Sequence, residues 1–311
     1  MWGYDWGMVL KDRNALVVLG PTASGKTRLG VGLARELGGE VVSADSRQVY
    51  RGLDIGTGKD LGEYVVEGVR VPCHLIDIVD PGEEFNVFEY QKRFYAVFEE
   101  LVARDVLPVV VGGSGLYIEA VLKGYRMVEA PEDPELRAEL DALPDAALVE
   151  RLASLKDRLH NTTDLATRDR MIRAIEIAAY SREHEAAPAP DIRPLILGTA
   201  WSRDHLRARI RQRLKERLSS GLIEEVERVH AAGTSWERLE QLGLEYRFVA
   251  EFLQGKIQNK NDLLQKLAAA ISAFAKRQDT WFRRMERNGA VIHWVPEARL
   301  EVARGIVHDG E

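Results

Sequence analysis

Short apolar segments alternate with amphipathic ones along the first third of the chain. Runs rich in Val, Ile and Leu lie at residues 15–19, 40–43, 74–78 and 107–111, and two more follow at 194–199 and 290–295. The residues at 26–37 and 88–103, between these runs, have the spacing of amphipathic helices. Nearly continuous apolar strands separated by helices are typical of a parallel sheet covered on both faces. The pattern therefore predicts an α/β core with a parallel sheet.

The middle of the chain has a different pattern. Apolar residues at 134–143, 146–155 and 167–180 have helical spacing, and no strand pattern interrupts them. An Ala- and Pro-rich stretch then leads back to a strand pattern, and from Asp204 onward the spacing is helical again, including a long segment at 262–287. We therefore expect residues 1–124 and 191–311 to form the core, and residues 125–190 to form a helical insertion.

Composition narrows the class of protein. The 311 residues are 45% hydrophobic and 30% charged, which excludes collagen-like and wholly disordered chains. The single cysteine, Cys73, has no partner for an internal disulfide, and the chain has no cysteine cluster for a structural zinc or an iron–sulfur centre. No run of 18 apolar residues and no signal-peptide pattern is present. We therefore expect a cytoplasmic protein with no membrane partner.

Basic residues are clustered although the net charge is −6. Seven Lys and Arg residues lie between Arg203 and Arg217, against two acidic residues. A second cluster contains Lys276, Arg277, Arg283, Arg284 and Arg287. Such runs form either solvated helix faces or contacts to phosphate groups, and charge alone does not distinguish the two.

The strongest chemical signal is GPTASGKT at residues 20–27, which follows an apolar run and precedes a helical one. It matches the phosphate-binding pattern GxxxxGK[ST], in which backbone N–H groups at a helix N-terminus surround a phosphate. Lys26 would neutralise the outer phosphate, and the Thr27 hydroxyl would bind Mg²⁺. The motif predicts a diphosphate or triphosphate ligand and does not say which.

Two polar residues follow other apolar runs. Asp45 comes after the second run, and Ser114 follows Gly112 and Gly113 after the fourth. Because ligands bind outside the carboxyl ends of parallel strands, we expect both residues beside the phosphate loop. A carboxylate there suits a general base, although aspartate also caps helices and lies near Mg²⁺. A kinase or ATPase would need a second acid for Mg²⁺, and Asp77 is available for that role.

Six motifs together resemble the tRNA dimethylallyltransferases, also called tRNA isopentenyltransferases. In chain order they are GPTASGKT, DSRQVYRGLDIGTGK, PCHLIDI, GGSGLY, RAIEI and AKRQDTWFRR, within residues 14–287. The resemblance implies transfer of the dimethylallyl group of dimethylallyl diphosphate to the exocyclic amine of the adenosine on the 3′ side of the tRNA anticodon. It also implies Mg²⁺ as cofactor, a P-loop nucleotide-binding core and an insertion that grips the anticodon stem-loop; we expect a monomer.

The resemblance also implies roles for single residues. Asp45 matches the general base, Ser114 stands where the family more often has Thr, and Arg213 matches an arginine that helps to bind the diphosphate. The implied diphosphate-binding residues are Gly20, Thr22, Ala23, Ser24, Gly25, Lys26 and Thr27, of which Thr27 also binds the metal. The implied tRNA-binding residues are Asp45, Ser46, Arg47, Gln48, Ser114, Arg137, Asp169, Arg170, Arg173, Lys276, Arg277 and Gln278.

The helical pattern supports Arg213 independently of the resemblance. Leu206, Ile210 and Leu214 form an apolar stripe on a helical wheel, and Arg213 lies just outside its edge. An arginine at that position reaches toward the interior more easily than one on the opposite face. The wheel therefore favours Arg213 as an inward-pointing cation.

Some positions depart from the family pattern. The family usually has TAKP where this chain has Thr57–Asp60, and Thr-Arg where it has Ile271 and Ser272; the family's GYRE is altered at residues 243–248. These changes do not affect the phosphate loop or the general base. They affect positions that the family uses to contact RNA. Prenylation of a free adenine nucleotide is therefore a second hypothesis, and a P-loop kinase is a third.

Overall fold

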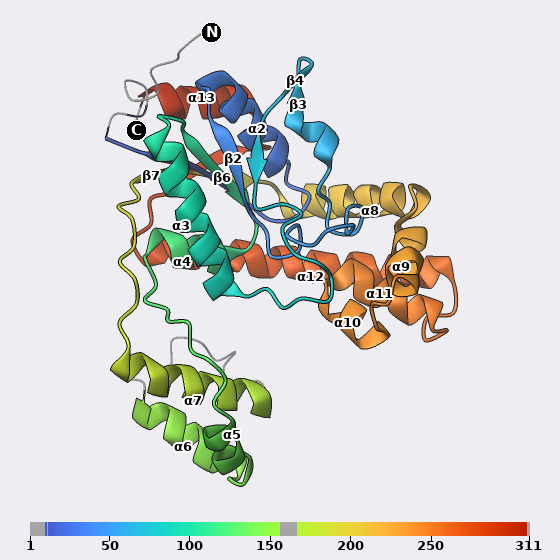
Figure 1. Ribbon diagram of the computed structural model, residues 1–311. Helices are drawn as coiled ribbons and strands as arrows, with labels where there is room; N and C mark the ends of the chain where they lie inside the picture. Colours follow the sequence, from blue (N-terminus) through green and yellow to red (C-terminus); the bar gives the residue numbers. More distant parts are fainter. Residues whose placement is uncertain (1–9, 11, 156–166, 310–311) are drawn as a thin grey trace. The chain divides into compact units, whose positions relative to one another are not determined.

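The computed structural model describes residue 10, residues 12–155 and residues 167–309. The chain divides into two compact units (Figure 1). Met1–Lys123 and Pro190–Glu311 form the larger unit, and Gly124–Ala189 form the smaller one. Each unit has its own apolar core, so we describe each by itself.

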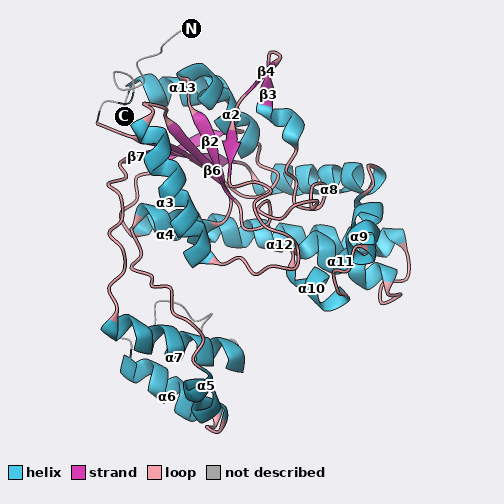
Figure 2. Ribbon diagram, viewed as in Figure 1, coloured by secondary structure: helices cyan, strands magenta, loops and turns pink. Residues whose placement is uncertain are grey.

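A parallel sheet of six strands is the centre of the larger unit (Figure 2). Its strands are β1 (Ala15–Leu19), β2 (Glu40–Ala44), β5 (Cys73–His74), β6 (Pro108–Gly112), β7 (Pro194–Ala200) and β8 (His293–Pro296), in the spatial order β5-β2-β6-β1-β7-β8. Leu16 of β1 pairs with Val109 on one side and Leu195 on the other. The strands β1, β2 and β6 are buried along their whole length, which explains their continuous apolar sequence. The predicted fold class is confirmed.

Helices cover both faces of this sheet. They are α2 (Lys26–Leu37) and α13 (Leu300–Asp309) on one face, and α3 (Val87–Ala103) and α4 (Gly115–Leu122) on the other. Leu16 and Val18 of β1 pack toward α2, whereas Val17 and Leu19 pack toward the aromatic side chains of α3. This alternation follows from the two-residue period of a strand, and it builds a separate apolar layer on each face.

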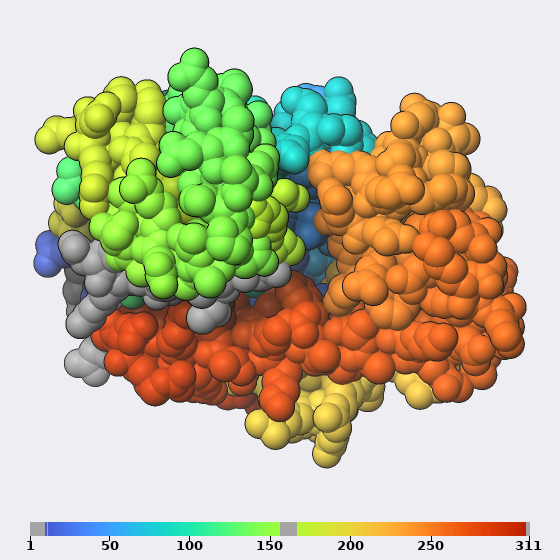
Figure 3. All heavy atoms as spheres, turned by 90° about the horizontal axis from the view of Figure 1, so that it is seen from below, coloured from blue at the N-terminus to red at the C-terminus, as the bar shows by residue number. Residues whose placement is uncertain are grey.

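Five further helices extend the unit at the carboxyl end of the sheet. They are α8 (Arg203–Ser219), α9 (Leu222–Ala231), α10 (Trp236–Gln241), α11 (Leu244–Leu253) and α12 (Lys260–Arg287). Figure 3 shows α12 lying against α11. The side chains of Ile271 and Ala275 belong to the core among these helices, while Phe282 and Met285 belong to the core beneath the sheet. Helix α12 therefore joins the helical layer to the sheet.

The described residues of the smaller unit form three helices, α5 (Pro134–Asp141), α6 (Asp145–Leu155) and α7 (Arg168–Glu183). Asp133 and Thr167 accept hydrogen bonds from backbone N–H groups in the first turns of α5 and α7. Leu148, Leu152 and Ile175 are fully buried in its core. The described residues of this unit contain no strand, in agreement with the helical spacing of its sequence.

The apolar run at 74–78 is a strand only at its beginning. Leu75 and Asp77 have positive φ angles of 61° and 56°, and the Asp77 N–H donates to the Gln48 carbonyl at 3.1 Å. The prediction of a strand through Ile78 is therefore wrong, because these residues pair with the loop that follows β2.

Three short elements precede this run. They are a turn of 3₁₀ helix, η1 (Leu61–Tyr64), and a hairpin formed by β3 (Val65–Val66) and β4 (Val69–Arg70). Elements of two to four residues are too short to be predicted from periodicity.

A buried lysine anchors the loop after β2. Lys59 is fully buried, and its Nζ donates to the Tyr50 carbonyl at 2.8 Å. The same ammonium group forms ion pairs with Asp54, at 2.7 Å, and with Asp77. Because a buried charge is tolerated only when it is paired and hydrogen-bonded, these contacts fix the path of the loop.

A carboxylate on α9 holds the same loop from the other side. Glu225, which is buried, accepts the backbone N–H groups of Asp54 at 3.0 Å, Ile55 at 2.8 Å and Gly56 at 3.0 Å. The hydroxyl of Tyr246 donates to it at 2.6 Å. One side chain thus accepts hydrogen bonds from four donors. Hydrogen bonds to a charged group are stronger than those between two neutral groups.

We predict that Glu225→Ala lowers the free energy of unfolding by about 2–5 kcal/mol, because it leaves several buried donors without a partner. Urea unfolding followed by circular dichroism measures this loss. Glu227→Ala, an exposed glutamate on the same helix, is the matched control and should change stability by less than about 0.5 kcal/mol. Equal stability of the two variants would contradict the assigned role of Glu225.

Candidate functional site

The phosphate loop lies at the carboxyl end of β1 and leads into α2. Gly25, the N-cap of α2, has a φ angle of 84°, a conformation that favours glycine. Lys26 and Thr27 are the first two residues of the helix, so the free N–H groups of its first turn lie at the loop. This geometry is suited to binding an anion.

Side chains from distant parts of the chain hold the loop in place. The Thr22 N–H donates to Gln278 Oε1 at 2.8 Å, and Gln278 Nε2 donates to the Gly113 carbonyl at 2.8 Å. A Cβ at Gly113 would lie only 2.5 Å from Gln278 Nε2, so the glycine permits this close approach. Trp201 Nε1 donates to the Ser24 carbonyl at 2.8 Å, and Arg209 Nε to the Ala23 carbonyl at 2.9 Å. The loop is therefore fixed before any ligand binds.

Two of the predicted loop residues face the interior of the protein. Ser24 is fully buried, and its hydroxyl accepts a hydrogen bond from Thr199 at 2.7 Å. Gly20 packs so closely against Thr199 that a side chain there would overlap it. Both residues support the loop from behind, whereas Ala23, Gly25, Lys26 and Thr27 line an open cavity.

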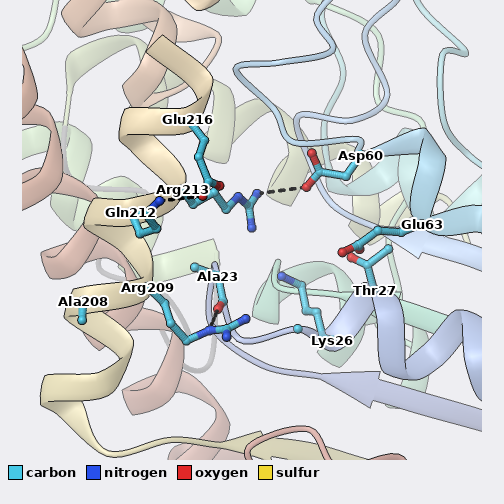
Figure 4. A pocket seen from close by; sticks show the side chains of 11 residues that line it. Ala23, Lys26, Thr27, Asp60, Glu63, Ala208, Arg209, Gln212, Arg213 and Glu216 are labelled. Atoms are coloured by element: carbon cyan, nitrogen blue, oxygen red, sulfur yellow. Dashed lines mark hydrogen bonds and ion pairs between the residues drawn. The ribbon is translucent and has the colours of Figure 1, made fainter. Parts of the chain in front are cut away.

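This first cavity, of about 480 Å³, lies between the phosphate loop, α8 and the residues around η1. Figure 4 shows Arg213 extending from α8 toward Asp60, with Thr27 beside Glu63 and the Lys26 side chain pointing into the cavity. Arg213 Nη2 lies 3.7 Å from Asp60 Oδ2. The cavity thus combines cations with hard oxygen donors, which suits a phosphate compound and a divalent cation.

Burial changes the titration of the charged groups in this cavity. The pKa of Lys26 is lowered to about 8, mainly because its ammonium group is buried; Asp45 partly offsets this and Arg213 adds to it. The pKa of Glu63 is raised by burial and by the neighbouring charge of Asp60. Both shifts reflect charges that lack full solvation, and an anionic or cationic ligand would relieve them.

A second cavity, of about 350 Å³, contains Asp45 and Ser114. Asp45 Oδ1 accepts the Arg47 N–H at 2.9 Å, and Ser114 Oγ accepts the Ser46 N–H at 3.0 Å. Both residues follow neighbouring strands, β2 and β6, so the sheet brings them together as their positions in the sequence predict. The site therefore has a carboxylate and a hydroxyl at one wall.

The two cavities have Lys26, Thr27 and Arg213 in common. These side chains therefore separate a phosphate-binding region from the region that contains Asp45. A phosphate compound bound at the loop would lie next to a carboxylate that is able to accept a proton. This shared wall is the main geometric feature of the site.

The residues implied in tRNA binding fall into three groups. Asp45, Ser46, Arg47, Gln48, Ser114, Arg277 and Gln278 line the second cavity. Lys276 instead lines a separate cavity between α8 and α12. Arg137, Asp169, Arg170 and Arg173 belong to the smaller unit, where the guanidinium groups of Arg137 and Arg173 both bind the buried carboxylate of Glu176. At least part of the role of these two arginines is thus to stabilise their own unit.

The site contains residues that the sequence reasoning missed. Arg217 and Glu245 line the second cavity, and Arg217 Nη1 lies 3.6 Å from Glu245 Oε1. Arg217 stands seven residues after Ile210, so it falls on the apolar stripe of its helix. A cation at an apolar position is a signal that could have identified it. Asp60 departs from the family pattern, so the resemblance gives it no role.

Asp77, the acid considered for a kinase, is used elsewhere. Its carboxylate forms an ion pair with the buried Lys59, and it lines neither of the two cavities.

Among the residues that the structure describes, no three His, Cys, Asp or Glu side chains gather in a metal-binding cluster. Within the same residues, no helix has the length and apolar character needed to span a membrane.

Comparisons with known proteins agree with this geometry. The family model of the IPP transferases matches residues 48–285. The tRNA dimethylallyltransferase 1 of Geotalea uraniireducens is 60% identical over 91% of this chain and 92% of its own. The corresponding protein of Syntrophus aciditrophicus is 57% identical over 91% and 93%.

Solved structures give the same result. The tRNA isopentenylpyrophosphate transferase of Bacillus halodurans is 32% identical, with a TM-score of 0.68 over 96% of this chain and 95% of its own. A eukaryotic dimethylallyltransferase acting on tRNA, 20% identical, shares the fold with a TM-score of 0.76 over 95% of this chain and 78% of its own. From the matched residues and these identities, the chain belongs to the IPP transferase family.

Proposed function

We propose that the chain transfers the dimethylallyl group of dimethylallyl diphosphate to the exocyclic amine of the adenosine on the 3′ side of the tRNA anticodon, with release of diphosphate. The family and the transferase activity were predicted from the sequence, and the comparisons confirm both. One observation carries the assignment to residues: the wall of Lys26, Thr27 and Arg213 is common to the phosphate-loop cavity and the cavity of Asp45.

In this proposal the diphosphate of the donor binds at the phosphate loop. Lys26, Arg213 and the N–H groups of the first turn of α2 surround it and stabilise the negative charge that grows as the allylic C–O bond breaks. Thr27, Asp60 and Glu63 offer oxygen donors at the same cavity, which fits a bound Mg²⁺. The metal would supply further positive charge to the leaving diphosphate.

The acceptor adenosine would enter the second cavity. Asp45 takes the proton from the exocyclic amine as the new C–N bond forms, and its second oxygen is free of protein hydrogen bonds among the described residues. Ser114 fixes the Ser46 backbone beside it. An adenosine in a stacked loop must leave the stack to reach this carboxylate, so the enzyme must flip it out.

Contacts with the rest of the tRNA would come from basic side chains. We propose Arg47, Arg277 and Gln278 for the anticodon loop, because they line the cavity that contains Asp45. The helical insertion, with Arg137, Asp169, Arg170 and Arg173, would grip the anticodon stem, and Lys276 would contact phosphate outside the cavity. We propose a cytoplasmic monomer, as we expect from the sequence.

The two other hypotheses have less support. Asp77, the acid that the kinase hypothesis assigned to Mg²⁺, is paired with Lys59 and lines neither cavity. An enzyme for a free adenine nucleotide would have no use for the helical insertion or for the arginine-rich face of α12. Prenylation of tRNA accounts for both features.

A direct assay tests the proposed function. With Mg²⁺ and labelled dimethylallyl diphosphate, we expect label to enter unmodified tRNA and not AMP. Removal of Mg²⁺ with a chelator should stop the transfer, and its return should restore it. Label in AMP alone would establish the second hypothesis, and ATP turnover without prenyl transfer would establish the third.

Asp45→Asn should lower the rate of prenyl transfer by about 10²–10⁴-fold, because the amide cannot accept the amine proton. Binding of the donor, measured by calorimetry, should change by less than about threefold, since Asp45 acts on the acceptor. Asp204→Asn, which changes an exposed aspartate on α8, is the control and should retain full activity. A wild-type rate in the Asp45 variant would show that this carboxylate is not the base.

Donor affinity should fall as the pH rises through about 8, the pKa of Lys26 in the free protein. Only the ammonium form attracts the diphosphate, and the charged fraction falls by about tenfold per pH unit above the pKa. We therefore expect about a tenfold loss of affinity between pH 7 and pH 9, relative to the variant Lys26→Arg, which stays charged. Calorimetric titrations at both pH values measure it, and parallel profiles for the two proteins would contradict the prediction.

A further inference from the structure

Arg217 is a buried cation beside the proposed diphosphate site. Its side chain is 10% exposed, and it lies one helical turn after Arg213 on α8. Its nearest acidic atoms are Glu245 Oε1 and Asp60 Oδ2, each 3.6 Å away, too far for a hydrogen bond. Its Nη2 atom is buried and has no hydrogen-bond partner.

A buried guanidinium whose acidic neighbours lie beyond hydrogen-bond distance is unfavourable. Burial and the charge of Arg213 both lower the pKa of Arg217, while Glu245 and Asp60 only partly offset this. Polar groups inside proteins nearly always find a partner, and exceptions are common where a ligand supplies it. The unsatisfied Nη2 therefore indicates that the site is incomplete without an anion.

The position of Arg217 indicates which anion would bind. Arg217 lines the cavity that also contains Lys26, Thr27 and Arg213. Any Cβ at residue 58 would overlap the Nη2 atoms of both Arg213 and Arg217, so Gly58 leaves the space that two adjacent guanidinium groups need. Two cations at this short spacing repel each other, and a dianionic or trianionic group between them removes that repulsion.

We propose that Arg217 is a second diphosphate-binding arginine, whose Nη2 donates to a non-bridging oxygen of the donor's diphosphate beside Arg213. This proposal rests on the proposed function, since it names a further residue of the same site. Asp60, 3.7 Å from Arg213 and 3.6 Å from Arg217, balances both charges in the unliganded protein. Glu245 lies on the Nη1 side of Arg217, whereas Nη2 lies beside Gly58 and Asp60 and has no hydrogen bond.

The role follows from the chemistry of the leaving group. When the allylic C–O bond breaks, its electron pair passes to the bridging oxygen, and the diphosphate gains one negative charge. A guanidinium fork next to the phosphate stabilises this charge more than it stabilises the bound donor. Loss of Arg217 should therefore lower both the affinity for diphosphate and kcat, and leave the KM for tRNA unchanged.

Binding of inorganic pyrophosphate with Mg²⁺, measured by calorimetry, tests the proposal without the prenyl reaction. We expect Arg217→Met, which keeps an apolar stem in the buried position, to weaken binding by about 10–100-fold. Arg211→Met, on the exposed face of the same helix, is the charge-matched control and should bind as the wild type does. Pyrophosphate binding at wild-type strength by folded Arg217→Met would overturn the proposal.

Two further variants separate a ligand contact from a structural one. Glu245→Gln removes an acidic neighbour and keeps the arginine, so it should bind pyrophosphate within about threefold of the wild type; a loss as large as that of Arg217→Met would assign Arg217 a structural role. If Arg217→Met does not fold, Arg217→Gln, which keeps a polar side chain and removes the charge, serves in its place, and wild-type affinity there overturns the proposal. Wild-type protein that binds pyrophosphate through Arg217 without prenylating tRNA would refute only the proposed function.

Discussion

The concentration of positive charge at one end of the sheet is the constraint on which the site depends. Lys26, Arg213 and Arg217 converge on one wall, although they come from the phosphate loop and from a helix almost 200 residues later. Such a cluster is unstable unless anions balance it. Asp45, Asp60 and Glu245 lie around it. Burial lowers the pKa of Lys26, and Asp45 offsets this only in part. The remaining charge is what an incoming diphosphate would neutralise.

The surrounding fold holds this wall in position by contacts that never touch a ligand. Gln278 on α12 links the phosphate loop to the loop after β6, and Trp201 and Arg209 bind the loop from the side of β7 and α8. Lys59 and Glu225 fix the segment that carries Asp60. The charges are thus preorganised, which is where most of the catalytic benefit of an electrostatic site arises.

The sheet, the phosphate loop and the meeting of Asp45 with Ser114 were predictable because they follow from local rules. Apolar runs mark buried parallel strands, a glycine-rich pattern marks the loop, and residues just after neighbouring strands must meet at one edge. The short strand β5 and the roles of Arg217 and Asp60 were not predictable in this way. They depend on contacts between distant segments, such as Asp77 with Lys59 and Gly58 with α8. The hydrophobic periodicity of a single segment carries no information about such contacts. The only local signal was the position of Arg217 on the apolar stripe of α8.

The direct test of the central claim is a crystal structure with a non-hydrolysable thio analogue of dimethylallyl diphosphate and an anticodon stem-loop. The account predicts that the diphosphate contacts Lys26, Thr27 and Arg213, and that the allylic carbon faces the adenosine amine beside Asp45. A diphosphate bound away from the loop, or an adenosine amine out of reach of Asp45, would contradict it.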